Sequence, residues 1–245
     1  MSMTPDALSE QLQAACGASL RSILLFGSAA AGDHLGKRSD YNVLIVLDRL
    51  DADVLKTMAP LARRWVRCGN PSPLLFTTQH LARAAGVFPL EMADLKESHR
   101  VLAGEDVTRT LSIDTSHVRY QLAHELEGKL MQLRARYLLV HGKPRQVTEL
   151  LVRSLSTFLV LCRGALRLYQ PQVPAKKLDA LAELAKHVSI QTRVFETIAH
   201  MKAGRAVAGV VPDALFDEYV RMIEVLIDVV EARSHPHQSA EEGRK

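Results

Sequence analysis

The sequence lacks the features that tie a chain to a membrane, to a disulfide scaffold or to a zinc site. Its three cysteines, Cys16, Cys68 and Cys162, lie far apart and form no Cys-x-x-Cys pair, which fits a reducing compartment. No apolar run approaches the roughly 18 residues of a membrane span. The first residues, MSMTPDALSEQ, include acids and no apolar core, so we do not expect them to act as a signal peptide. We expect a soluble, cytoplasmic protein.

Positive charge is in small excess over negative charge. The formal net charge is +4 at pH 7, and the isoelectric point is about 9.0. This balance suits an anionic ligand such as a nucleotide, but it is too small to indicate a nucleic-acid surface. Neither a nucleic acid nor a membrane is therefore expected as a partner, and the sequence leaves a homodimer open.

The most informative stretch is RSILLFGSAAAGDHLGKRSDYNVLIVLD, from Arg21 to Asp48. It predicts a strand over Ile23–Phe26, a turn at Gly27 and Ser28, and a second strand over Tyr41–Leu47. Glycine permits a backbone conformation that other residues resist, and free amides at such a turn bind phosphate oxygens. Gly27 and Ser28 are therefore candidates for contact with phosphate.

This stretch resembles the nucleotidyltransferase superfamily of the DNA polymerase β type, in which a strand ends in Gly-Ser and the next strand carries Asp-x-Asp. The pattern matches at Gly27, Ser28, Ser39 and Asp40, and it departs at Asn42, which replaces the second acid. The resemblance implies nucleotide binding by Gly27, Ser28 and Ser39. It also implies that Asp40 is a catalytic residue and a magnesium ligand, with Asn42 as a neutral second ligand.

Nucleotidyl transfer places strict demands on this site. Two magnesium ions stabilise the attacking and leaving oxygens, and magnesium prefers anionic oxygen ligands. In the aminoglycoside adenylyltransferases that the domain resembles, a Pro-Leu-Glu motif supplies a third acid; the matching segment here ends in Leu75. A later Pro-Leu-Glu ends at Glu91 and is followed by Asp94. One of these acids could substitute if a strand over Leu90–Leu95 lies beside Asp40.

The fold class predicted from the whole chain is α+β. Residues 1–110 form a nucleotidyltransferase-like domain whose mixed sheet includes Leu74–Thr78 and Leu90–Leu95. Residues 115–233 form an all-α helical bundle, and residues 234–245 a disordered tail. Helices are expected over Pro5–Cys16, Asp51–Val66, Thr115–Val140, Val147–Tyr169, Ala175–Val188, Gln191–Ala203 and Pro212–Arg233. The helix over Val147–Tyr169 is apolar nearly all round, which predicts burial of Leu151, Leu155, Phe158, Leu159 and Cys162.

Three functions compete on these grounds. The first is a degenerate nucleotidyltransferase, a pseudoenzyme that binds a nucleoside triphosphate or a partner with weak or no catalysis. The second is an active metal-dependent enzyme that moves a nucleoside monophosphate onto a small molecule or a protein. The remotest is a HEPN-type ribonuclease, marked by Arg, four to six residues and His, as in Arg136 and His141; such matches occur here about as often as chance gives.

Overall fold

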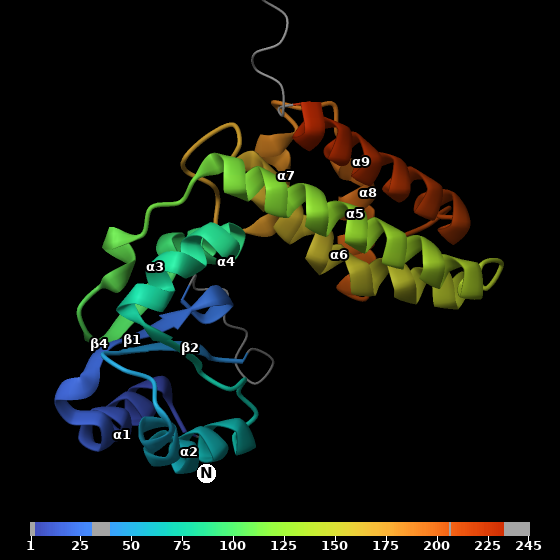
Figure 1. Ribbon diagram of the computed structural model, residues 1–245. Helices are drawn as coiled ribbons and strands as arrows, with labels where there is room; N and C mark the ends of the chain where they lie inside the picture. Colours follow the sequence, from blue (N-terminus) through green and yellow to red (C-terminus); the bar gives the residue numbers. More distant parts are fainter. Residues whose placement is uncertain (1–2, 31–39, 206, 233–245) are drawn as a thin grey trace, which may run out of the picture. The chain divides into compact units, whose positions relative to one another are not determined.

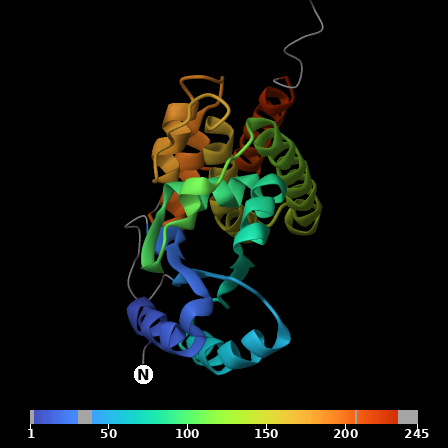
Figure 2. The same ribbon diagram turned by 60° about the vertical axis from the view of Figure 1, so that its left-hand side comes forward.

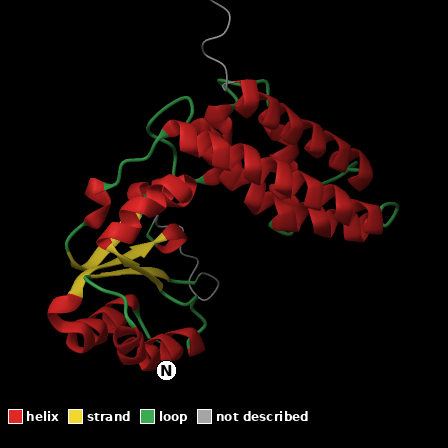
Figure 3. Cartoon of the chain, viewed as in Figure 1, coloured by secondary structure: helices red, strands yellow, loops and turns green. Residues whose placement is uncertain are grey.

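A computed structural model describes residues 3–30, 40–205 and 207–232 of the chain. Ser39 and the predicted tail at 234–245 lie outside the described residues. The chain divides into two units, Met1–His117 and Val118–Lys245. The first contains a sheet with helices on both faces, and the second contains helices (Figures 1 and 3). The fold class is therefore α+β, as the sequence predicts.

The sheet of the first unit has four strands in the described residues, in the order β3-β2-β1-β4. They are β1 (Leu20–Phe26), β2 (Asn42–Leu47), β3 (Leu74–Thr77) and β4 (His99–Gly104). β1 runs antiparallel to β2 and to β4, whereas β3 runs parallel to β2. The predicted strand over Leu90–Leu95 is wrong, because this segment lies inside helix α4 (Pro89–Glu97). Pro89 suits the first turn of a helix, which needs no amide donor there.

Side chains of the central strands alternate between two apolar layers. Ile23, Val43 and Ile45 face a cluster that includes buried residues of α1 (Pro5–Cys16) and α2 (Ala52–Arg67). Leu24 and Leu44 face the opposite cluster, which includes α3 (Thr78–Val87) and α4. Figure 1 shows these helix pairs on either side of the sheet. Because both faces are covered, β1 and β2 read as nearly continuous apolar runs in the sequence.

The second unit is built around α6 (Pro144–Leu166). The five core residues predicted on this helix, from Leu151 to Cys162, are all at most 5% exposed, which confirms the prediction. Around α6 lie α5 (Thr115–Val140), α7 (Lys177–Leu184), α8 (Thr192–Lys202) and α9 (Pro212–Ala232). Figure 2 shows these helices from a second side. No helix in the described part of the chain combines the length and the apolar composition needed to cross a membrane.

Candidate functional site

The candidate site begins where β1 turns away from the sheet. Gly27 has a φ of +77°, in the left-handed region that favours glycine. It opens a short 3₁₀ turn, η2 (Gly27–Ala29), which Ala30 closes by donating its amide to the Gly27 carbonyl at 3.0 Å. The turn predicted at Gly27 and Ser28 is thus a single tight turn of 3₁₀ type.

Asn42 lies directly against this turn. It pairs with Phe26 in the antiparallel ladder of β1 and β2, so it sits beside the last residue before Gly27. A Cβ atom on Gly27 would lie 3.3 Å from the Nδ2 atom of Asn42. Asp40 precedes the strand and is exposed, whereas Asn42 is half-buried. The fold therefore brings the Gly-Ser turn next to the residue that replaces the second acid.

The register between β2 and β3 decides which side chain of β3 shares a face with Asn42. Leu44 pairs with Leu74, and Ile45 pairs with Leu75. Since neighbouring residues of a parallel pair point to the same side, Leu74 shares the face of Leu44 and Asn42. Leu75 lies on the opposite face and packs in the cluster that contains Ile45. The structure thus corrects the placement of Leu75: the β3 residue on the face of Asn42 is Leu74, which is 45% exposed and carries no charge either.

Glu91 and Asp94, the two acids that could replace the missing carboxylate, do not lie on a strand. Glu91 and Asp94 lie on α4, a helix that packs on the sheet through Met92 and Leu95. They are therefore not on a strand beside Asp40, which was the condition for their role. Glu91 is exposed and Asp94 is half-buried.

His99 is a residue of this region that sequence analysis did not single out. It pairs with Phe26 in the register of β1 and β4, two strands and about 10 Å from Asn42 across the sheet. Its Nδ1 atom donates to the Leu95 carbonyl at 3.0 Å, and its Nε2 atom lies 3.1 Å from Asp106. Since both ring nitrogens are engaged, His99 ties β4 to its neighbours and is poorly placed to act as a base. The prediction of a strand over HRVLAG would have placed His99 beside β1.

Asp106 is held as a carboxylate by this arrangement. Burial by itself raises the pKa of its carboxyl group. Hydrogen bonds from the hydroxyl and the amide of Thr108, together with His99, outweigh burial and leave the pKa below its ordinary value. The cluster stabilises the link between β4 and the following turn, η4 (Val107–Thr110).

The donors beside Asp40 do not fit a pair of divalent ions. Among the described residues, no group of three or more His, Cys, Asp or Glu side chains could hold a metal ion. Asp40 offers one carboxylate and Asn42 a neutral amide oxygen, while Leu74 offers no donor. Two magnesium ions carry four positive charges and prefer anionic oxygens, so this set balances them poorly.

The arginine and histidine named for the ribonuclease hypothesis, Arg136 and His141, contact different residues. Arg136 lines a hollow between α5 and α6, whereas His141 pairs through Nδ1 with Asp213 of α9 at 3.0 Å. Arg136 thus lies between α5 and α6, whereas His141 contacts α9.

Comparison with solved structures identifies the fold. No protein-family model matches the chain, and no curated protein sequence does. A similar structure is the crystal structure of spectinomycin adenyltransferase AAD(9) from Enterococcus faecialis with ATP and spectinomycin. The similarity covers 94% of this chain and 100% of that chain, with a TM-score of 0.55 and 14% identity. The chain therefore has the nucleotidyltransferase fold that the Gly-Ser and Ser-Asp motifs predict.

Proposed function

We propose that this protein binds a nucleoside triphosphate at the turn after β1 and transfers its nucleotidyl group weakly or not at all. The observation that carries the proposal is the charge of the sheet face beside Asp40. Asn42 and Leu74 occupy the positions on the neighbouring strands, and neither is an acid. Magnesium ions that would neutralise the transition state therefore have Asp40 as their single anionic ligand at this face.

Nucleotide binding is supported by the turn itself. Gly27 adopts a conformation in which the backbone can approach a phosphate closely. AAD(9), which shares the fold, was crystallised with ATP. With one carboxylate at Asp40, we expect at most one Mg²⁺, held largely by the triphosphate. Binding should accordingly be weak and only modestly dependent on the metal.

The alternative is an active enzyme that uses Asp40 and an acid from elsewhere in the chain to transfer a nucleoside monophosphate. A pyrophosphate-release assay separates the two. It is run with each nucleoside triphosphate, with Mg²⁺ or Mn²⁺, and with small-molecule and protein acceptors. We expect no release above the level without protein. A parallel titration of ATP by calorimetry should show binding.

Asp40→Ala supplies the decisive variant, and Asp53→Ala is its control. Asp53 lies on α2 with 87% of its side chain exposed, so the control removes the same charge at a remote surface position. Release by the natural protein that Asp40→Ala abolishes and Asp53→Ala preserves would overturn the degenerate reading. Absence of ATP binding by the natural protein would overturn the nucleotide-binding part.

A further inference from the structure

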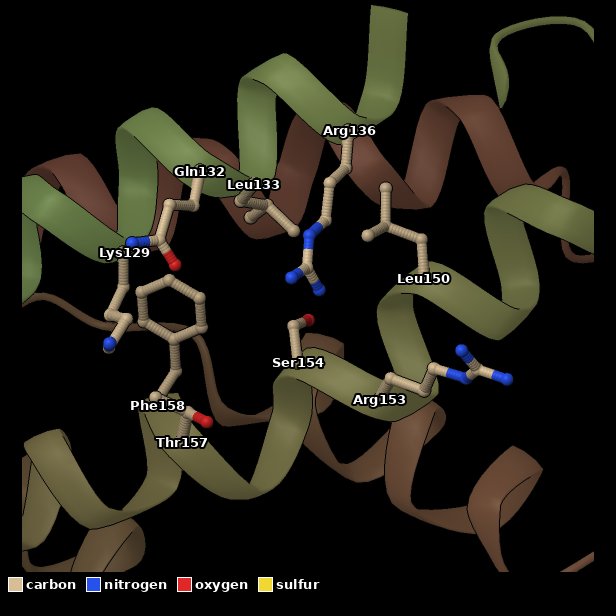
Figure 4. A pocket seen from close by; sticks show the side chains of 9 residues that line it. All are labelled: Lys129, Gln132, Leu133, Arg136, Leu150, Arg153, Ser154, Thr157 and Phe158. Carbon is tan, nitrogen blue, oxygen red and sulfur yellow. The ribbon is translucent and has the colours of Figure 1, made fainter. Parts of the chain in front are cut away.

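A hollow of about 100 Å³ lies between α5 and α6 in the second unit (Figure 4). Its α5 residues recur at intervals of three and four from Lys129 to Arg136, and its α6 residues do so from Leu150 to Thr157. Such a stripe faces the neighbouring helix, and in a bundle it is normally apolar. Most of the side chains that line this hollow are polar instead: Lys129, Gln132, Arg136, Arg153, Ser154 and Thr157.

The charge of the α5–α6 hollow has one sign. Lys129, Arg136 and Arg153 line it, and none of its lining residues is acidic. Lys129 and Arg153 each pair with a glutamate four residues earlier on their own helix, and such pairs at exposed or partly exposed positions are weak. Arg136 forms no ion pair within the described part of the chain. The hollow thus holds a positive charge at Arg136 that no acidic side chain of the described residues neutralises.

Two donors of the hollow, on Arg136 and Ser154, meet in the space between the helices (Figure 4). In Figure 4 the Arg136 side chain extends from α5 toward α6, and its guanidinium ends opposite the Ser154 hydroxyl. That hydroxyl donates to the Leu151 carbonyl at 3.0 Å and can turn toward a ligand. Arg153 points away along α6 and lies at the rim. Arginine presents a planar fork of donors that matches phosphate oxygens.

We propose that the α5–α6 hollow binds the phosphate or diphosphate group of a small phosphorylated ligand. A phosphate group carries up to two negative charges and three terminal oxygens, enough to accept from Arg136, Lys129 and the hydroxyls of Ser154 and Thr157 together. A carboxylate has one charge and two oxygens and would leave part of this donor set unused. The site uses residues of the second unit alone, so it is independent of the nucleotide site proposed at Gly27.

The test is calorimetric titration of the full chain at low salt with inorganic phosphate and pyrophosphate, each compared with citrate. We expect saturable binding of one pyrophosphate in the hollow. Arg136→Gln should weaken it roughly ten- to a hundredfold, because a charged hydrogen-bond donor is lost. Arg221→Gln removes the same charge from an exposed position on α9 outside the hollow and should leave the affinity unchanged.

A second pair of variants tests the site without removing an arginine. Thr157 is exposed, so both replacements should fold. Thr157→Glu places a negative charge at the hollow and should abolish binding, whereas Thr157→Gln should retain it. Circular dichroism of each variant checks that the helices persist.

Three results would overturn the proposal. The first is an absence of phosphate and pyrophosphate binding by the natural protein. The second is pyrophosphate binding that is unchanged in both Arg136→Gln and Thr157→Glu. If Gly27→Val then abolishes that binding, the anion binds at the turn after β1. The third is tighter binding of citrate than of pyrophosphate, which would exclude phosphate as the ligand class.

Discussion

Restoring carboxylates beside Asp40 tests whether missing charge is what weakens the site. Asn42→Asp should place a second carboxylate near an ion held by Asp40. A charge of −1 at about 5 Å from a divalent ion in water contributes about 1.7 kcal/mol, roughly a sixteenfold gain in affinity. The water value of the dielectric constant applies because Asp40 is exposed.

A third carboxylate should help only from the correct face of β3. Leu74 on β3 pairs with Leu44 on β2, and Leu44 lies two residues beyond Asn42 on the same strand. Leu74 and Asn42 are therefore about 8 Å apart. At that distance Leu74→Glu should add about 1 kcal/mol, roughly sixfold, when combined with Asn42→Asp. Leu75→Glu adds the same charge one residue further on but on the opposite face. At about 11 Å the same arithmetic gives a smaller gain, about 0.75 kcal/mol or roughly 3.5-fold, and coordination of the ion is not possible from that face. The substitution should also cost roughly 2–4 kcal/mol of stability, since Leu75 packs in the apolar cluster.

The assay is calorimetric titration of ATP into each variant, with Mg²⁺ and with chelator, at low ionic strength so that screening does not hide the effect. Urea denaturation gives the stability of each variant. An equal gain from Leu75→Glu and Leu74→Glu would refute the register argument. No gain from Asn42→Asp would refute the claim that charge is limiting.

The parts of the fold that the sequence predicts are those with the strongest burial. The first two strands are covered on both faces and were recognisable as apolar runs, within three residues at each end. β4 was missed because an edge strand is half-exposed and HRVLAG carries two basic residues. The run over Leu90–Leu95 was misread because a short apolar run fits a buried helix as well as a strand.

The candidate site was predictable only where it depends on local pairing. β1 ends and β2 begins at paired residues, Phe26 and Asn42, so antiparallel pairing of these two consecutive strands brings Gly27 near Asn42. The placement of Leu74 and Leu75 depends instead on the register between the parallel strands β2 and β3, which α2 connects. No local sequence signal sets that register. A slip of one residue exchanges the two faces of a strand, so the sequence could not tell which leucine faces Asn42. The polar residues of α5 that line the hollow gave no signal of their own, because they lie beside the apolar stripe that forms the core.

Two further predictions concern the second unit. Leu155→Ala should lower the free energy of unfolding by roughly 2–5 kcal/mol in urea denaturation, because Leu155 is 2% exposed. Leu138→Ala, at a position 80% exposed, should change little; equal costs would mean that α6 is not the core helix. The last prediction concerns the 2.7 Å hydrogen bond from the Tyr137 hydroxyl to Asp213. This bond lowers the pKa of Asp213 and raises that of Tyr137 to about 12. The contribution of Asp213 is present above its ordinary carboxyl pKa of 3.8 and is lost as pH falls through its lowered value. That of Tyr137 is present below pH 10 and is lost as pH rises toward 12. Tyr137→Phe should therefore lower Tm at pH 7, and its deficit should shrink at both pH extremes. Tyr120→Phe, at an exposed tyrosine of the same helix, should melt like the natural protein throughout. A deficit in Tyr137→Phe that stays constant from pH 3 to pH 11 would refute the assignment of this stabilisation to the bond between Tyr137 and Asp213.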